Sequence, residues 1–155
     1  MKTLLTASVL LLVVTLAPAP AAAAFGVATS AGIGMIFVDK DVERSNVDLE
    51  ILLFYKLSML KIDLAMRMDM EDIDQKVQLL PGVRLDLPLV YLRAAIPVNV
   101  HGAFDWGFLV GLGMDYQFMK VIAVFAELDT TIYLKDGDPT SHWPLEARVG
   151  LELTF

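Results

Sequence analysis

The sequence predicts an all-β fold, an eight-stranded antiparallel up-and-down transmembrane β-barrel. Three observations support this prediction. Apolar and polar side chains alternate with a period of two along most of the chain. The alternating segments have ~10 to 13 residues, about the length that a tilted strand needs to cross a bilayer. No acidic residue falls on the apolar face of any of these segments.

The first 24 residues have the pattern of a cleaved secretory signal peptide. Met1-Lys2 supplies a positive start, residues 4–16 are uncharged and mostly apolar, and residues 17–24 are all Ala or Pro. A transmembrane anchor is the alternative, but the apolar run is short and has no basic residue on its far side. We expect cleavage after Ala23 or Ala24, so that 1–24 is the signal peptide and 25–155 is one outer-membrane barrel domain.

The composition excludes several classes of protein. The 155 residues include no cysteine, which excludes a disulfide framework and a thiolate metal site. Loss of Lys2 with the signal peptide would leave 11 basic against 19 acidic residues, so a nucleic-acid partner is disfavoured. No later segment has the roughly 18 to 20 uncharged apolar residues of a membrane helix. We therefore expect strands to cross the membrane, and we expect no cofactor.

Eight segments show the period of two, and residues 60–70 show it most clearly. There Leu60, Ile62 and Leu64 alternate with Lys61 and Asp63. The predicted strands are residues 25–38, 47–55, 60–70, 77–87, 92–101, 106–118, 121–133 and 143–155.

The connections between these segments alternate in length and charge. The four more polar connections are residues 39–45, 71–75, 102–105 and 135–142, and the three short ones are residues 56–59, 88–89 and 119–120. All nine acids outside the strands lie in the four polar connections. Bacterial barrels show the same asymmetry, with long loops outside and short turns in the periplasm. Within the strands, Pro81 and Pro97 predict bulges, because proline cannot donate to a ladder.

The distribution of charge favours lipid outside the barrel. Ten acids fall on the polar faces, namely Asp48, Glu50, Asp63, Asp69, Asp86, Asp115, Glu127, Asp129, Glu146 and Glu152. A soluble β-sandwich tolerates stray surface charges, whereas a cation at the middle of a bilayer costs ~2 to 4 kcal/mol. A soluble lipocalin-like barrel, with its apolar face inside, is a further alternative. Glycines on the polar faces, such as Gly32 and Gly111, suit a narrow lumen and favour the membrane barrel.

Aromatic residues add a weaker indication of two membrane interfaces. Membrane barrels carry aromatic girdles at both interfaces, although strand ends of any barrel can carry aromatic residues. One rim of the apolar faces has Phe37, Trp106 and Trp143, and the other has Phe25, Tyr55, Tyr116, Phe118 and Phe155.

The last strand carries the most specific motif. Arg148, Gly150, Leu153 and Phe155 fill an order that resembles the C-terminal insertion signal of outer-membrane β-barrel proteins. Together with the period of two, the whole mature chain resembles the small eight-stranded outer-membrane barrels, such as the OmpA transmembrane domain and OmpX. The resemblance implies location in a bacterial outer membrane and contact with lipid and lipopolysaccharide. It also implies that the barrel-assembly machinery recognises the C-terminal strand and that the protein is a monomer.

Charged side chains on the polar faces predict an ion network inside the barrel. An eight-stranded barrel has an interior that side chains just fill, so these groups should meet and pair. We expect Arg67 opposite Asp48 or Glu50, and Arg148 beside Glu127, Asp129 or Glu50. The predicted network consists of Asp48, Glu50, Asp63, Arg67, Arg84, Glu127, Asp129, Glu146 and Arg148. We interpret it as structural, because buried charges persist when they are paired; an ion path or gate is the alternative.

Apolar side chains on the same faces predict a plug near the periplasmic end. Leu52, Phe54, Val121 and Phe125 point inward there, together with Ala123. Such a plug argues against continuous conduction through the barrel.

Three functions remain open at this stage. A non-enzymatic barrel that serves envelope structure or a surface or small-ligand interaction is our prediction, and a narrow or gated channel is the first alternative. The second is an enzyme that resembles lipid A palmitoyltransferase or deacylase, whose His, Ser and acid lie near the outer rim. The only candidates for those roles are Ser141, His142, Glu146, His101 and Asp129, and neither family's motif can be aligned to them. The acidic loops lack the ligand spacing of an EF-hand, so no metal site is predicted.

Overall fold

The computed structural model describes residues 23–38, 41–71, 77–100, 106–135, 138–139 and 142–155. Within these ranges the chain forms one antiparallel sheet of eleven strands. The strands are β1 (Ala24–Val38), β2 (Asp41–Arg44), β3 (Asp48–Leu57), β4 (Leu60–Asp69), β5 (Val77–Asp86), β6 (Tyr91–Ala95), β7 (Val98–Asn99), β8 (Trp106–Met119), β9 (Ile122–Lys135), β10 (Asp138–Pro139) and β11 (His142–Thr154). No helix among the described residues is long and apolar enough to cross a membrane.

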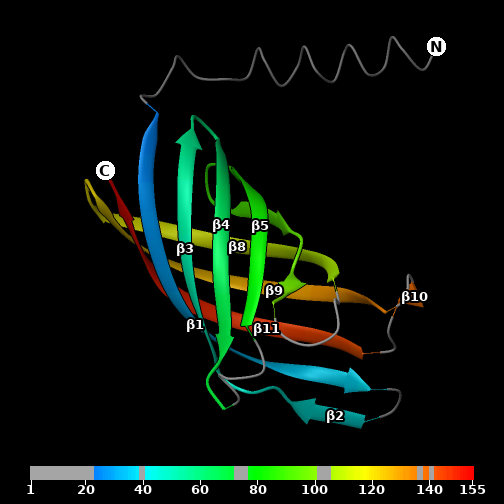
Figure 1. The fold of residues 1–155 in the computed structure, drawn as a ribbon. Helices are drawn as coiled ribbons and strands as arrows, with labels where there is room; N and C mark the ends of the chain where they lie inside the picture. Colours follow the sequence, from blue (N-terminus) through cyan, green and yellow to red (C-terminus); the bar gives the residue numbers. More distant parts are fainter. Residues whose placement is uncertain (1–22, 39–40, 72–76, 101–105, 136–137, 140–141) are drawn as a thin grey trace, which may run out of the picture.

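The sheet closes into an eight-stranded barrel in which β6 and β7 together count as one barrel strand. The order around the barrel is β1-β3-β4-β5-β6/β7-β8-β9-β11, and β11 pairs with β1 to close it. The closing ladder extends from Gly26 opposite Thr154 to Val38 opposite His142. The predicted eight-stranded antiparallel barrel is confirmed (Figure 1).

Two short strands add to the barrel at one end. β2 pairs with the last residues of β1, from Met35 opposite Arg44 to Val38 opposite Asp41. β10 pairs with the end of β9. The sequence predicts only loops at these two places, because strands of four and two residues rich in charged side chains are too short to show a period of two.

The connections divide the barrel into two different ends. The turn end has the short connections Ser58–Met59, Leu87–Val90 and Lys120–Val121. The first and last strands also meet there, where the Phe155 N–H donates to the Phe25 carbonyl at 2.7 Å. The loop end has the four longer connections and the added strands β2 and β10, which lie at the lower right of Figure 1. This is the asymmetry that the sequence predicts.

The prolines leave the strand register unchanged. Pro81 lies opposite Leu64 in an unbroken register, and β6 and β7 keep one register against β5 on both sides of Pro97. Both prolines still accept cross-strand bonds, because the Ile96 N–H donates to the Pro81 carbonyl and the Gly107 N–H to the Pro97 carbonyl. The prediction of bulges is therefore wrong at both prolines. A shift in register occurs instead in β8, between Gln117 and Met119.

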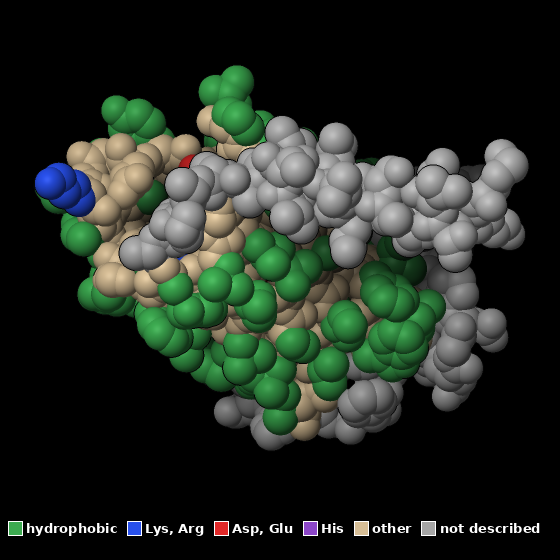
Figure 2. Space-filling view, turned by 90° about the horizontal axis from the view of Figure 1, so that it is seen from above, with side chains coloured by type: hydrophobic (Ala, Val, Ile, Leu, Met, Phe, Trp, Pro, Cys, Tyr) green, Lys and Arg blue, Asp and Glu red, His purple; other side chains and the backbone are tan. Residues whose placement is uncertain are grey.

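Apolar side chains face outward and polar side chains face inward. In β4, Leu64 is 49% exposed whereas Arg67 is 5% exposed. The same alternation runs through β5, β6 and β8. Hydrophobic side chains cover the wall seen in Figure 2, with almost no charged side chain among them. Among the described residues, a small apolar cluster of Ala65, Leu80, Ala95 and Leu109 lies in the interior.

Candidate functional site: the barrel lumen

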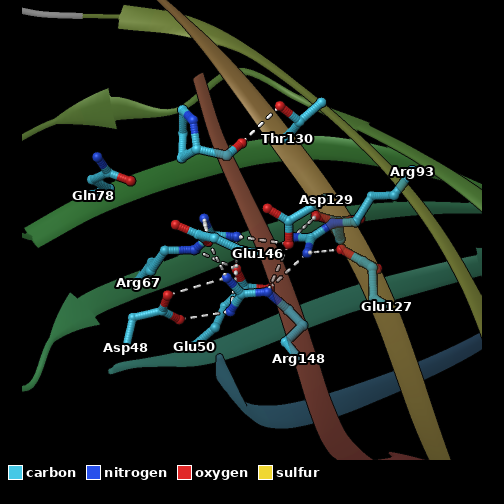
Figure 3. A network of polar contacts seen from close by, with 12 residues as sticks. Asp48, Glu50, Arg67, Gln78, Arg93, Glu127, Asp129, Thr130, Glu146 and Arg148 are labelled. Atoms are coloured by element: carbon cyan, nitrogen blue, oxygen red, sulfur yellow. Dashed lines mark hydrogen bonds and ion pairs between the residues drawn. The ribbon is translucent and has the colours of Figure 1, made fainter. Parts of the chain in front are cut away.

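The middle of the lumen is filled by a network of buried ion pairs, which we call the mid-lumen network. Its side chains come from β3, β4, β6, β9 and β11 and point toward one another across the barrel (Figure 3). Its members are Asp48, Glu50, Asp63, Arg67, Arg93, Glu127, Asp129, Glu146 and Arg148. Side chains along each strand point alternately into the lumen and out to the wall. Two residues that are two positions apart on one strand therefore both point inward, one above the other along the barrel axis.

Arg148 on β11 is the most buried cation of the network. Its Nε donates to Asp129 Oδ2 at 2.8 Å, and its Nη1 donates to Asp48 Oδ1 at 2.8 Å. Its Nη2 donates to Glu146 Oε2 at 2.8 Å. Asp129 is one of the partners that the sequence predicts, whereas Asp48 is an unpredicted partner 100 residues away along the chain. The guanidinium thereby joins the closing strand to β3 and β9.

Arg67 on β4 occupies the predicted position opposite Glu50. Its Nε and Nη2 donate to Glu50 Oε2 at 3.1 and 3.0 Å. Its Nη1 reaches across the lumen and donates to Glu146 Oε2 at 2.9 Å. Arg67 and Arg148 therefore share Glu146, and the two guanidinium groups form one network.

Arg93 on β6 belongs to the network, although the predicted set omits it. Its Nη1 donates to Glu50 Oε1 at 2.7 Å, and its Nη2 donates to Asp63 Oδ1 at 3.3 Å. Glu127 Oε1 lies 3.5 Å from Nη1. The period of two places Arg93 on the polar face, but the contact to Glu50 depends on the barrel diameter, which the sequence does not give.

A second ion cluster lies nearer the turn end, and we call it the turn-end cluster. Lys61 Nζ donates to Glu152 Oε1 at 2.6 Å, and Arg84 Nη1 donates to Glu152 Oε2 at 3.2 Å. Arg84 also pairs with Asp86 at 2.7 Å and with Asp115. The sequence places Arg84 in one network with Arg67 and Arg148; the structure places it in this separate cluster, because its strand position lies closer to the turn end.

Aromatic rings narrow the lumen at the level of the turn-end cluster. Phe54 is buried, with its ring against the backbone of Gly26, and the Phe125 ring lies against Gly150. Lys61 Nζ lies 4.8 Å from the centre of the Phe54 ring. The region predicted to be an apolar plug is therefore a mixture of rings and ion pairs.

Val121 does not contribute to this narrowing. It lies in the β8–β9 turn and its side chain is 51% exposed, so its assignment to the plug is wrong. The turn occupies Lys120–Val121, one residue further along than the predicted Met119–Lys120, and the inward alternation begins only after it. Leu52 lies beside the small apolar cluster, and Ala123 is buried, as expected for inward residues.

A cavity of about 20 Å³ lies between the two ion clusters. Tyr91, Arg93, Glu127 and Glu152 are among the residues that line it. The Tyr91 hydroxyl and Arg93 Nε are buried without a hydrogen-bond partner among the described residues. A cavity of this size holds about one water molecule, so it admits no hydrated ion.

A larger cavity of about 380 Å³ opens at the loop end, and we call it the vestibule. Its floor is formed by Asp48, Arg67 and Glu146 of the mid-lumen network. Its walls are formed by Ile36, Glu43, Arg44, Ser45, Asn46, Asp69, Gln78, Tyr133 and Pro144. Gln78 Nε2 donates to the Tyr133 hydroxyl at 3.1 Å, and Asn46 Nδ2 donates to Asp69 Oδ2 at 2.8 Å. The vestibule therefore has a polar wall and a closed, charged floor.

The candidate catalytic residues are not brought together by the described part of the chain. His101 and Ser141 lie outside the described residues, as does the side chain of His142. Glu146 and Asp129 both hold arginines of the mid-lumen network. Among the residues that the structure describes, no group of three or more acidic or histidine side chains could hold a metal ion.

The residues of the C-terminal motif divide between the two faces of β11. Arg148 points inward, and Gly150 lies opposite Ser30 and beneath the Phe125 ring. Leu153 and Phe155 point outward and are exposed. Their function as an insertion signal stays a prediction.

Aromatic pairs occur at both ends of the outer wall. Phe25 and Tyr55 lie at the turn end with ring centres 4.7 Å apart, and Trp106 and Phe108 lie at the loop end with ring centres 5.2 Å apart. The side chain of Trp143 lies outside the described residues. Each of the two aromatic rims that the sequence predicts therefore has an aromatic pair in the structure.

Comparison with solved structures places the fold among membrane barrels. The chain is similar to Neisserial surface protein A (NspA), with a TM-score of 0.65 and 15% sequence identity over 87% of this chain and 100% of that one. The chain has the fold of a transmembrane β-barrel. It is also similar to a structure described as a de novo design of transmembrane β-barrels, with a TM-score of 0.51 and 12% identity over 84% of this chain and 95% of that one. No protein-family model and no curated protein sequence matches the chain.

Proposed function

We propose that the chain is a monomeric bacterial outer-membrane protein that crosses the membrane as a closed barrel. The outward apolar wall supports this location, because an exposed hydrophobic surface around a whole barrel needs lipid to cover it. Residues 1–24 act as an export signal that is removed. The loop end faces outward, toward lipopolysaccharide, and the barrel-assembly machinery recognises the last strand through Leu153 and Phe155.

We propose further that the barrel is a non-enzymatic protein of envelope structure or surface interaction, and not a porin. The observation that carries this proposal is the mid-lumen network. Arg67, Arg93 and Arg148 fill the lumen, and their bonds join strands that are not neighbours in the sheet. Breaking such pairs to admit an ion would leave buried charges without partners, which is strongly unfavourable.

The vestibule favours one form of surface interaction, the binding of a small polar ligand. It is open at the loop end, has about 380 Å³ of space and carries hydrogen-bonding groups on a closed floor. Binding sites for small molecules are concave and use a few well-placed polar groups for specificity.

The proposal is tested by two assays on purified, refolded barrel. In a planar bilayer the wild-type protein should give no conductance steps, and in a lipid A acylation assay it should leave the acylation pattern unchanged. Steps of conductance would replace the proposal with a channel. A changed acylation pattern would replace it with a lipid-modifying enzyme.

A further inference from the structure

The turn end of the barrel carries exposed hydrophobic side chains where a water-facing end would carry polar ones. Leu89, in the β5–β6 connection, is 86% exposed. Leu57 and Leu60 flank the β3–β4 turn, and Met119 and Val121 flank Lys120 in the β8–β9 turn; all four are exposed as well. Turns in water are normally rich in Gly, Pro, Asn, Asp and Ser, and of these residue types the three turns contain only Ser58 and Pro88.

The charge of the two ends differs as strongly as their hydrophobicity. The twelve residues 57–60, 87–90 and 118–121 include no acid and one base, Lys120. The four longer connections at the other end include nine acids. A lipid surface with anionic headgroups therefore fits the charge of the turn end.

The hydrophobic surface of the turns is continuous with the outer wall. On β8 it runs from Tyr116 through Phe118 to Met119, and on β5 it runs from Leu85 to Leu87 and Leu89. No charged side chain separates the wall from the turns along either path. The surface that lipid covers thus extends without interruption over the tip of the barrel.

Neighbouring backbone segments at the turn end are linked by hydrogen bonds. The Asp86 N–H donates to the Met59 carbonyl at 2.7 Å, and the Leu87 N–H donates to the Val90 carbonyl at 2.8 Å. The Thr154 N–H donates to the Val121 carbonyl at 2.9 Å. Internal pairing of this kind is what backbone needs when it lies in lipid instead of water.

We propose that the turn end is immersed in the headgroup and upper acyl region of the periplasmic phospholipid leaflet and does not project into water. The occupant of this surface is phospholipid, because the three turns continue the lipid-covered wall and Lys120 is the one charged residue of their sequence. The inference rests on the proposed membrane location of the barrel.

The absence of cysteine makes a clean test possible, because each single-cysteine variant carries one label. We would label Leu89→Cys with an environment-sensitive fluorophore in vesicles of phosphatidylethanolamine and phosphatidylglycerol. Leu128→Cys, on the outer wall between the ends, is the control for lipid contact. Asp41→Cys, exposed on β2 at the loop end, is the control for water contact. Quenchers are iodide on both sides of the membrane and nitroxide-bearing lipids.

We expect the Leu89→Cys label to be quenched by shallow nitroxide lipids and several-fold less by iodide than the Asp41→Cys label. If Leu128→Cys is quenched by lipid and Leu89→Cys by iodide, the tip lies in water and this inference alone is overturned. If Leu128→Cys is quenched by iodide, the proposed membrane location itself fails. Disulfide-linked dimers through Leu89→Cys at low protein-to-lipid ratio would assign the surface to a second copy and would also overturn the inference.

Discussion

The two ion clusters of the lumen use the same residue types in different surroundings. In the mid-lumen network, the side chains of Arg148 and Asp129 are both fully buried and lie 2.8 Å apart. At the edge of the turn-end cluster, Lys56 on β3 pairs with Asp86, a member of the cluster; the two lie 3.2 Å apart with 37% and 17% of their side chains exposed. Exposed pairs contribute ~0 to 1 kcal/mol, whereas loss of one partner from a buried pair costs ~3 to 5 kcal/mol. The turn-end cluster also holds a buried pair, Lys61 with Glu152, so the comparison teaches that burial of a pair, and not its mere presence, decides which charges hold the barrel closed.

The largest expected effect of a single substitution comes from Arg148→Ala. The change leaves Asp48 buried without its cation and leaves Asp129 with only Arg67 at 3.6 Å, so the free energy of unfolding should fall by ~3 to 5 kcal/mol. Urea unfolding from lipid vesicles measures the change. Arg148→Met combined with Asp48→Leu and Asp129→Leu should recover most of the lost stability. In this variant no buried carboxylate is left without a cation. A loss below ~1 kcal/mol in Arg148→Ala would mean that water already reaches the network.

The second effect concerns the aromatic narrowing. Phe54→Ala with Phe125→Ala removes the two rings against Gly26 and Gly150, so each change should cost ~3 kcal/mol or more. If the lumen has a latent path, small conductance steps should appear in a planar bilayer. Val121→Ala is the matched control, because its exposed side chain lies in a turn, and it should leave both stability and conductance unchanged. Equal losses in all three variants would contradict the assignment of the rings to the lumen.

The difference between Lys61 and Lys56 sharpens the comparison within one cluster. Lys61 is buried against Glu152, whereas Lys56 is partly exposed beside Asp86. Lys61→Met should lower the free energy of unfolding by ~1 to 3 kcal/mol, because Glu152 loses a buried partner and keeps only Arg84. Lys56→Met should change it by less than ~1 kcal/mol. High salt should weaken only the Lys56 pair, which the same unfolding assay can detect.

The smallest expected effect on stability is that of Phe155→Ala. The side chain is exposed at the turn end and fills no part of the lumen. If it serves as an insertion signal, the variant should refold normally in detergent but reach the outer membrane in reduced amount in cells. Cell fractionation with immunodetection measures that amount. Wild-type levels would show that the motif resembles an insertion signal without acting as one.

The sequence predicts the barrel and the inward face well, because both follow from a period of two. Glu50 and Arg67 are the clearest case, since a two-residue turn fixes the register between their strands. The contact between Arg148 and Asp48 could not be predicted, because it joins strands whose distance depends on barrel diameter and side-chain length. Arg93 was missed from the network for the same reason.

Local features limit the prediction in other places. Val121 was assigned to the lumen because the sequence fixes the position of the turn only to within one residue. A shift of one residue moves every side chain of the strand to the opposite face of the sheet. β2 was expected to be a loop, because its four residues are three charged side chains and one valine, too few to show a period of two. Pro81 and Pro97 were expected to cause bulges, but a carbonyl bond is enough to keep the register on both sides.

A double-mutant cycle on Arg148 and Asp129, measured beside the same cycle on Lys56 and Asp86, tests the central claim most directly. Each cycle gives the coupling energy of one pair from the unfolding free energies of the wild type, two single variants and the double variant in vesicles. We predict ~2 to 3 kcal/mol of coupling for Arg148 with Asp129 and less than ~0.5 kcal/mol for Lys56 with Asp86. Equal coupling energies, or none for the buried pair, would contradict the claim that the mid-lumen network closes the barrel.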